Sequence, residues 1–220
     1  MPRFAAILPA AGSSSRFGGN RNKLFEVLEG RTVLQRSVDA FLRRSDVAAV
    51  VIPTRGQVLV EGDKIIRCTG GACRAESVLA GLRAVPTDVE WVAVHDAARP
   101  LVSQELIDRT LAAAVEHGAA VPAMAVHLTI KQATGPLPAR VERTVPRQTL
   151  WAMQTPQIMR RAALLEAFEK CPVPLDQVTD DVQLIELAGG EVWLVAGEER
   201  NLKITTSPDL EIAKMHASTF

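Results

Sequence analysis

Phe4-Ala5-Ala6-Ile7-Leu8-Pro9-Ala10-Ala11-Gly12 is an apolar run that leads directly into a loop of small residues. Its first five residues are apolar without alternation, which is typical of a strand buried on both faces of a sheet. Pro9 ends the run, and the segment from there to Asn22 is rich in Gly and Ser. This order predicts a core strand that presents a loop of small residues at its carboxyl end.

Further apolar runs alternate with segments of helical period. We expect strands at residues 47–52, 64–67, 91–95, 119–126 and 192–196, with Pro53 stopping the first of these. We expect helices at residues 32–44, 76–84, 103–117, 160–168, 179–188 and from about 208, with Ser103 as an N-cap. The alternation predicts an α/β fold in which helices cover both faces of a mostly parallel sheet.

The pattern changes between residues 127 and 150. The turn cluster Gly135-Pro136-Leu137-Pro138 separates two short polar segments, 129–132 and 140–145. A β-hairpin with little core of its own is therefore expected. Because an isolated hairpin is only marginally stable in water, we expect this 127–150 arm to pack on something else, and a second subunit is the partner we favour.

Composition narrows the class of protein. The 220 residues carry 25 Lys and Arg against 25 Asp and Glu, and this balance argues against a nucleic-acid partner. The apolar start is too short to span a membrane and lacks a cleavage-site pattern, so we expect no membrane partner. Three cysteines without metal spacing indicate free thiols in a reducing compartment, so a cytoplasmic location is expected.

Two loops that follow strands carry groups suited to phosphate. In the first, small residues can present backbone N–H groups to an anion, and Arg16 and Lys23 add positive charge. In the second, Gly70-Gly71 permits close approach of a ligand, and Arg74 and Ser77 project from the first turn of a helix. The alternatives are a flexible surface loop for the first and an ordinary Gly-Gly turn for the second.

A third loop is His95-Asp96-Ala97-Ala98-Arg99-Pro100. A carboxylate at the end of a strand suits Mg²⁺, which takes one or two carboxylates and completes its shell with water and phosphate. The alternative is a structural pair in which Arg99 bridges the turn to Asp96. We expect His95 to be a packed, hydrogen-bonded residue rather than a base.

Taken together, these segments resemble one family, the 2-C-methyl-D-erythritol 4-phosphate cytidylyltransferases. The resemblance runs from Ile7 to about Leu210, so we expect residues 1–220 to form a single domain. The matching segments, in order, are Pro9-Ala10-Ala11-Gly12 with Arg16 and Lys23, Gly70-Gly71 with Arg74 and Ser77, residues 95–100, Thr155-Pro156-Gln157, Thr179-Asp180, and Asn201-Leu202-Lys203-Ile204-Thr205.

The resemblance implies a Rossmann-like nucleotidyltransferase of non-mevalonate isoprenoid precursor biosynthesis. It would join CTP and 2-C-methyl-D-erythritol 4-phosphate to give 4-diphosphocytidyl-2-C-methyl-D-erythritol, with release of pyrophosphate and with Mg²⁺ as cofactor. It also implies a homodimer whose 127–150 arms interlock.

The resemblance also assigns roles to residues. Arg16, Lys23, Asp96 and Lys203 would be catalytic, and Asp96 would also hold Mg²⁺. The acceptor would contact Asp96, Arg99, Thr129, Arg147, Thr179 and Lys203, with Thr129 and Arg147 reaching in from the neighbouring subunit. The nucleotide would contact Pro9, Ala10, Ala11, Gly12, Ser13, Gly70, Gly71, Arg74, Ser77, Asp96 and Ala97.

The sequence departs from the family pattern in three places. Ser14 replaces a Gly, so its N–H is presented as usual only if its backbone angles are ordinary. Asn22 replaces the Pro before Lys23, which predicts a less rigid loop. Ala72 and Cys73 replace acidic residues, so contacts to the base there must come from the backbone.

Three other functions compete with this interpretation. A cytidylyltransferase for ribitol 5-phosphate or another polyol phosphate would share the cytidine half of the site. A non-catalytic nucleotide-binding regulatory protein would not need the retained cations. An NAD-linked dehydrogenase would require a Gly-x-Gly-x-x-Gly turn, which the loop at Gly12 lacks.

Overall fold

The computed structural model of the chain describes residues 1–12, 14, 17–18 and 22–217. In this part of the chain an eight-stranded sheet has the order β10-β7-β11-β6-β1-β4-β5, with β12 also paired to β7. Strands β10 and β11 run antiparallel to their neighbours, and the other pairs are parallel. The strands are β1 (Phe4–Ile7), β4 (Val47–Thr54), β5 (Ile65–Thr69), β6 (Trp91–Val94), β7 (Ala119–Ala125), β10 (Trp151–Met153), β11 (Gln157–Arg160) and β12 (Trp193–Ala196).

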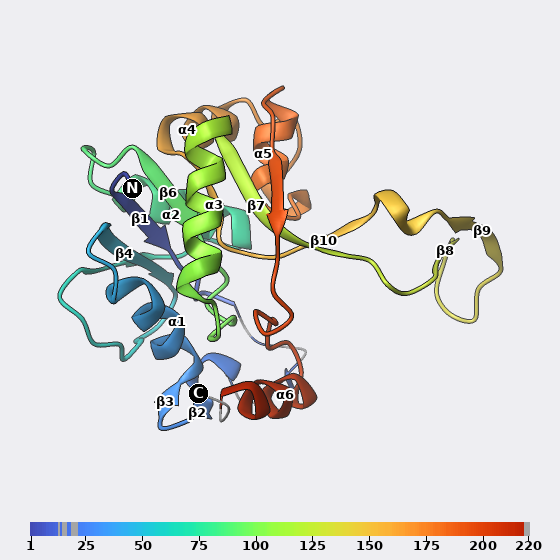
Figure 1. Cartoon of the computed structure of the whole chain (residues 1–220), viewed down its shortest axis with the longest axis horizontal. Helices are drawn as coiled ribbons and strands as arrows, with labels where there is room; N and C mark the ends of the chain where they lie inside the picture. Colours follow the sequence, from blue (N-terminus) through green and yellow to red (C-terminus); the bar gives the residue numbers. More distant parts are fainter. Residues whose placement is uncertain (13, 15–16, 19–21, 218–220) are drawn as a thin grey trace.

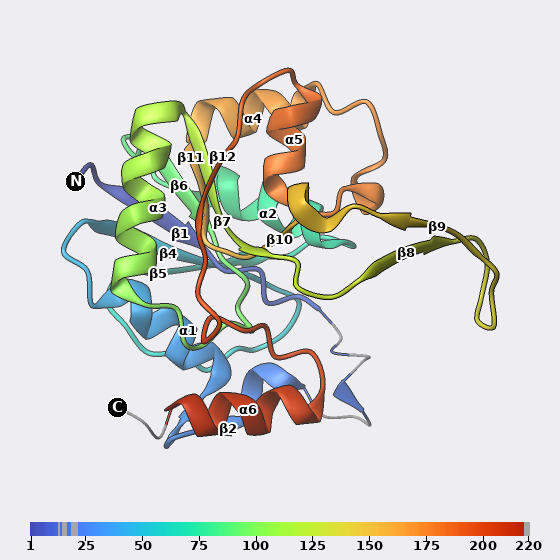
Figure 2. The same ribbon diagram turned by 45° about the vertical axis from the view of Figure 1, so that its right-hand side comes forward.

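Helices cover both faces of this sheet (Figures 1 and 2). Alternate residues of β1 point to opposite faces, as the pleat of a strand requires. Phe4, Ala6 and Leu8 join a core with α1 (Val33–Leu42), α3 (Gln104–His117) and α6 (Ser207–Ala217). Ala5 and Ile7 join a second core with α2 (Arg74–Ala84), α4 (Arg161–Glu169) and α5 (Asp181–Leu187). The predicted Rossmann-like α/β fold is confirmed.

Capping hydroxyl groups place the starts of two helices where the sequence predicts them. The Thr32 hydroxyl accepts a hydrogen bond from the N–H of Gln35 at 3.1 Å and begins α1. The Ser103 hydroxyl accepts one from the N–H of Leu106 at 2.9 Å and begins α3, so the predicted N-cap is confirmed.

Two features of the sheet differ from the prediction. Strand β4 does not stop at Pro53 but continues to Thr54. Pairing of β1 with β4 ends at Ile7 and Val51, so Pro53 lies beyond the last hydrogen bond between these two strands and its missing N–H interrupts none of them. The Pro53 carbonyl accepts a hydrogen bond from the N–H of Ala10 at 2.8 Å. Strands β10 and β11 are not among the predicted strands; β11 fills the sheet between β6 and β7, and β10 pairs with the carboxyl-terminal part of β7.

The 127–150 arm is a hairpin that projects from the body (Figure 1). Its strands β8 (Ile130–Ala133) and β9 (Val141–Val145) form a separate two-stranded antiparallel sheet. Leu128 and Leu137, on the arm, are 78% and 88% exposed. The predicted hairpin is therefore present, and these two apolar side chains are left uncovered in a single chain. A shorter hairpin, β2 (Val27–Leu28) with β3 (Arg31–Thr32), packs near α6.

Within the described residues, no helix combines the length and the apolar character that crossing a bilayer requires.

Candidate functional site

An open cavity of about 410 Å³ lies at the carboxyl edge of the parallel strands. The loop after β1, the first turn of α2, the loop after β6 and the segment before α6 form its walls. Open α/β sheets bind ligands at this edge. The residues that line the cavity are Pro9, Ala11, Gly12, Ser14, Lys23, Leu24, Arg55, Gly71, Ala72, Cys73, Arg74, Ser77, Asp96, Ala97, Ala98, Lys203 and Thr205.

Most of the predicted catalytic and nucleotide-binding residues lie in this wall. The structure brings together Pro9, Ala11, Gly12, Lys23, Gly71, Arg74, Ser77, Asp96, Ala97 and Lys203. Two further predicted residues, Ser13 and Arg16, lie outside the described residues.

Other predicted residues do not line the cavity. Ala10 is 7% exposed and lies in the core behind the first loop. Gly70 is not one of the lining residues, but it lies next to one, because a Cβ on it would be 2.6 Å from the Cβ of Ala11. Thr129 and Arg147 lie on the arm, and Thr179 precedes α5. The acceptor residues predicted from resemblance are thus only partly assembled in one chain.

The carboxylate of Asp96 is the electrostatic centre of the cavity. Lys203 Nζ lies 3.0 Å and Arg99 Nε lies 3.2 Å from its Oδ2, and Arg74 Nε lies 3.5 Å from its Oδ1. Burial alone would raise the pKa of Asp96, but the charges of Arg74, Lys203 and Arg99 hold it well below its usual range. Asp96 is therefore ionised at neutral pH.

Arg99 supports this centre from behind. It is 8% exposed, and its Nη1 donates to the carbonyl of Asn201 at 2.7 Å. The structural pairing of Arg99 with Asp96 is therefore real, but it accounts for only one of the three cations around that carboxylate.

A buried hydrogen-bond chain orients the backbone of Asp96. Its N–H donates to the Thr155 hydroxyl at 3.0 Å, and that hydroxyl lies 3.0 Å from His95 Nδ1. His95 Nε2 lies 3.1 Å from the carbonyl of Arg99. Because a carbonyl only accepts, Nε2 carries the proton and Nδ1 accepts from Thr155. Burial lowers the pKa of His95 to about 4, so the ring is neutral, and His95 is packed and hydrogen-bonded as predicted.

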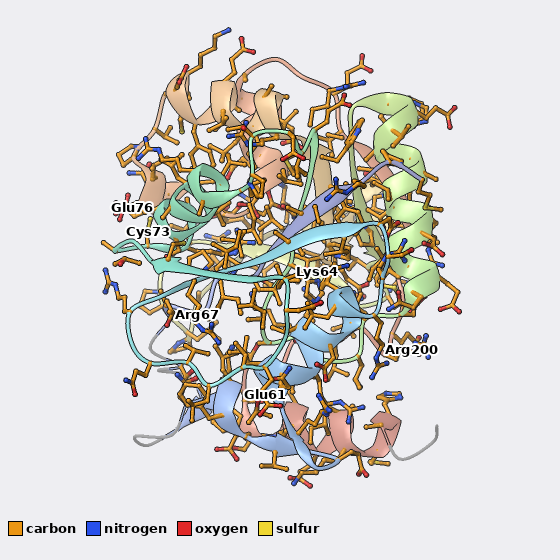
Figure 3. The ribbon with its side chains drawn as sticks, turned by 90° about the vertical axis from the view of Figure 1, so that its left-hand side faces the viewer. Glu61, Lys64, Arg67, Cys73, Glu76 and Arg200 are labelled. Carbon is orange, nitrogen blue, oxygen red and sulfur yellow. The ribbon has the colours of Figure 1, made fainter. Side chains whose placement is uncertain are left out.

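The Gly71 loop is held by its own side chains. A Cβ at Gly71 would lie 2.2 Å from the Cβ of Glu76, so only glycine fits. The Ser77 hydroxyl accepts from the N–H of Gly71 at 3.1 Å and donates to the carbonyl of Cys73 at 2.9 Å. Glu76 Oε2 accepts from the N–H of Ala72 at 2.5 Å, and Cys73 and Glu76 lie close together at the start of α2 (Figure 3). Both loop N–H groups are therefore already paired.

The first loop shows how two departures from the family pattern are accommodated. Ser14 has a φ of +55°, so the condition that its backbone angles are ordinary is not met. Its hydroxyl donates to Asn22 Oδ1 at 3.0 Å, and that oxygen also accepts from the N–H of Leu24 at 3.0 Å. Asn22 thus caps the short helix η2 (Lys23–Phe25).

Sequence reasoning missed two charged residues at this site. Arg55 lines the cavity and directly follows β4, which ends at Thr54. Ligands lie beyond the ends of parallel strands, but the predicted strand ends at Ile52, so this rule does not point to Arg55. Asp181, in the first turn of α5, is fully buried, and its Oδ2 lies 2.8 Å from Arg74 Nη2. Asp180 is the N-cap of α5, because its Oδ1 accepts from the N–H of Gln183 at 2.9 Å.

The donor set fits a magnesium ion held mainly by a ligand. Among the described residues, no group of three His, Cys, Asp or Glu is placed to hold a metal ion, and Asp96 is the one carboxylate that lines the cavity. Mg²⁺ bound to substrate phosphates takes one or two protein carboxylates, so Asp96 alone satisfies that requirement.

Comparison with known proteins finds relatives over nearly the whole chain. A family model described as 2-C-methyl-D-erythritol 4-phosphate cytidylyltransferase matches residues 4–218. A protein of that name from Dechloromonas aromatica is 41% identical over 98% of this chain and 97% of the relative. The bifunctional enzyme IspD/IspF of Rhodospirillum rubrum is also 41% identical, over 97% of this chain, and the match spans 57% of that relative's length.

A solved structure has the same fold. The crystal structure of 2-C-methyl-D-erythritol 4-phosphate cytidylyltransferase from Thermus thermophilus matches with a TM-score of 0.82 and 36% identity. The match covers 99% of this chain and all of that chain, so the likeness extends over the whole fold that carries the cavity.

Neutral His95 makes the stability of the fold depend on pH. Its pKa falls from 6.5 to about 4 on folding, so between these values the unfolded chain binds a proton that the folded chain does not. Stability is therefore lost as pH falls through this window. Urea unfolding should show that His95→Gln flattens this dependence by up to about 1.4 kcal/mol per pH unit. Identical slopes for the two proteins between pH 4 and 6.5 would mean that His95 is not buried in its neutral form.

Proposed function

Since the chain belongs to the 2-C-methyl-D-erythritol 4-phosphate cytidylyltransferase family, a family of nucleotidyltransferases, we propose that it joins CTP to 2-C-methyl-D-erythritol 4-phosphate. The products are 4-diphosphocytidyl-2-C-methyl-D-erythritol and pyrophosphate, and the reaction serves non-mevalonate isoprenoid precursor biosynthesis. The observation that carries the proposal is a cavity whose described residues set four cations, Lys23, Arg55, Arg74 and Lys203, against the single carboxylate of Asp96.

The chemistry asks mainly for positioning and positive charge. An oxygen of the acceptor phosphate forms a bond to the α-phosphorus of CTP, and the bond from that phosphorus to the leaving pyrophosphate breaks. The attacking oxygen is already ionised, so no protein base is required. Both reactants are anions, and two unit charges about 4 Å apart repel by roughly 4 kcal/mol at an effective dielectric constant near 20. Cations fixed around the reacting phosphates oppose this repulsion.

Each side of the cavity has a role in this proposal. Lys23, with Arg16 from the undescribed part of the same loop, holds the triphosphate and the charge that develops at the α-phosphorus. Asp96 orients the hydroxyls of the acceptor, and Lys203, which lies beside that carboxylate, contacts the acceptor phosphate. Asp96 would also hold Mg²⁺, which when bound neutralises phosphate charge.

The cytosine is read by the Gly71 side of the cavity. Since the N–H groups of Gly71 and Ala72 are paired to Ser77 and Glu76, carbonyl oxygens are the backbone groups left to meet the base. The exocyclic amino group of cytosine is a donor, so it suits a carbonyl acceptor. The Ser77 hydroxyl then acts by holding the loop rather than by touching the base.

The acceptor side needs a second copy of the chain. Thr129 and Arg147 lie on a projecting arm, and in one chain Arg147 donates to the nearby carbonyl of His127 on the same arm. We propose a homodimer in which the 127–150 arm of each copy reaches the cavity of the other and covers the exposed Leu128 and Leu137. A cytoplasmic location without nucleic-acid or membrane partners stays a prediction from composition.

Ribitol 5-phosphate is the competing acceptor, because the cytidine half of the cavity would be shared. Pyrophosphate release from CTP, measured with each acceptor separately, decides between them. We expect the higher kcat/KM with 2-C-methyl-D-erythritol 4-phosphate. Faster turnover with ribitol 5-phosphate would identify the alternative enzyme, and no release with either would favour a regulatory nucleotide-binding protein.

Lys23→Ala tests the role of the first loop. Removing this cation should lower kcat by about 100-fold or more, by analogy with the loss of one donor to a developing oxyanion. Lys170→Ala is the matched control, since Lys170 pairs with Glu166 on the exposed side of α4. Unchanged turnover in Lys23→Ala would show that the triphosphate lies elsewhere.

Mixed dimers test whether the arm acts on the partner. A dimer of one Lys23→Ala chain and one Arg147→Ala chain retains one intact site only if Arg147 serves the other subunit. Co-expression should therefore restore about a quarter of wild-type activity, from two variants that are each nearly inactive alone. If Arg147 serves its own chain, the mixture stays as inactive as its parents.

A further inference from the structure

Ser14 holds a backbone conformation that residues with a side chain rarely adopt. Its φ of +55° lies in the left-handed region, where a Cβ is unfavourable. Such a conformation persists when surrounding contacts hold it in place. Ser14 also lines the cavity together with Gly12 and Lys23, so the contacts that hold it lie where the triphosphate is proposed to bind.

Those contacts join the two sides of the first loop. The Ser14 hydroxyl donates to Asn22 Oδ1 at 3.0 Å, across eight positions of the sequence. The Ser14 carbonyl accepts from the N–H of Phe17 at 2.9 Å. A glycine at position 14 would adopt the same φ freely but would supply no hydroxyl.

Asn22 carries the contact directly to Lys23. Its Oδ1 accepts from the N–H of Leu24 at 3.0 Å, and its carbonyl accepts from the N–H of Phe25 at 2.9 Å. Leu24 is 5% exposed and belongs to the core. Lys23 therefore lies between a residue fixed by the Ser14 hydroxyl and a residue fixed by packing.

We infer that Ser14 and Asn22 are a pair of positioning residues that set the backbone of Lys23, so that its ammonium group meets the phosphates of CTP. A lysine side chain has four flexible methylenes, so its reach is defined only when its backbone is fixed. The inference rests on the proposed function, because it assigns a task to the lysine of that site. Each residue supplies what the other needs, since the Ser14 hydroxyl donates and Asn22 Oδ1 accepts.

Ser14→Ala, Asn22→Ala and the double variant test the pair. Each single change should lower kcat/KM for CTP by about 3- to 10-fold, the effect of losing one neutral hydrogen bond. The double variant should lose no more than the larger single effect, because both changes break the same contact. The KM for the acceptor should stay unchanged. Additive losses, or equal losses toward both substrates, would overturn the inference.

Ser14→Gly separates positioning from stability. Glycine relieves the left-handed conformation, so the Tm should hold or rise, while kcat/KM for CTP should fall as it does in Ser14→Ala. In a Lys23→Ala background, neither Ser14→Ala nor Asn22→Ala should reduce activity further. A merely structural role predicts that Ser14→Gly keeps full kcat/KM for CTP. It also predicts that Ser14→Ala and Asn22→Ala lower activity further in the Lys23→Ala background. Either result would overturn the inference.

Calorimetric titration with CTP keeps this test separate from the proposed reaction. If the wild-type chain releases no pyrophosphate with either acceptor, the proposed function fails, and the dissociation constant for CTP still reports on the pair. We expect weaker CTP binding in Ser14→Ala and in Asn22→Ala, and an unchanged value in Ser45→Ala, an exposed serine before β4. Unchanged binding and unchanged kcat/KM in the first two variants would overturn the inference.

Discussion

The charge of Asp96, set at the end of β6 with only 11% of its side chain exposed, is the constraint on which the site depends. A carboxylate in this position is costly unless cations and hydrogen bonds surround it. Arg74 comes from α2, Arg99 from the loop after β6, and Lys203 from the segment before α6. Balancing the charge of one carboxylate therefore brings three separate parts of the chain to the same edge of the sheet.

The fold was predictable where its signals are local. The unbroken apolar run Phe4–Leu8 indicates a strand covered on both faces, and Thr32 and Ser103 mark helix starts through their own hydroxyl groups. Strands β10 and β11 carry no comparable signal, because they are short and owe their place to the strands they pair with, β6 and β7. The strand end predicted at Pro53 is wrong for a similar reason. A proline stops a strand only where its missing N–H would pair with a neighbouring strand, and β1 ends before that point.

The sequence predicts which residues come together at the site, because loops that follow parallel strands lie at the same edge of the sheet. What each residue does there depends on tertiary contacts that spacing does not reveal. Ser77 lines the cavity as predicted, yet its hydroxyl is engaged by Gly71 and Cys73. Asp181 stands in the first turn of α5, and it lies buried against Arg74. Burial raises the pKa of Asp181, against the opposing charge of that arginine.

The path of the chain out of the arm joins two distant parts of the molecule. Strand β10 ends at Met153, and only Gln154 separates it from Thr155, whose hydroxyl receives the N–H of Asp96. Strand β10 and Gln154 are hydrogen-bonded to β7, so the point where the arm joins the body is fixed within the sheet. The base of the hairpin and the carboxylate corner are therefore anchored by one short, continuous stretch of chain.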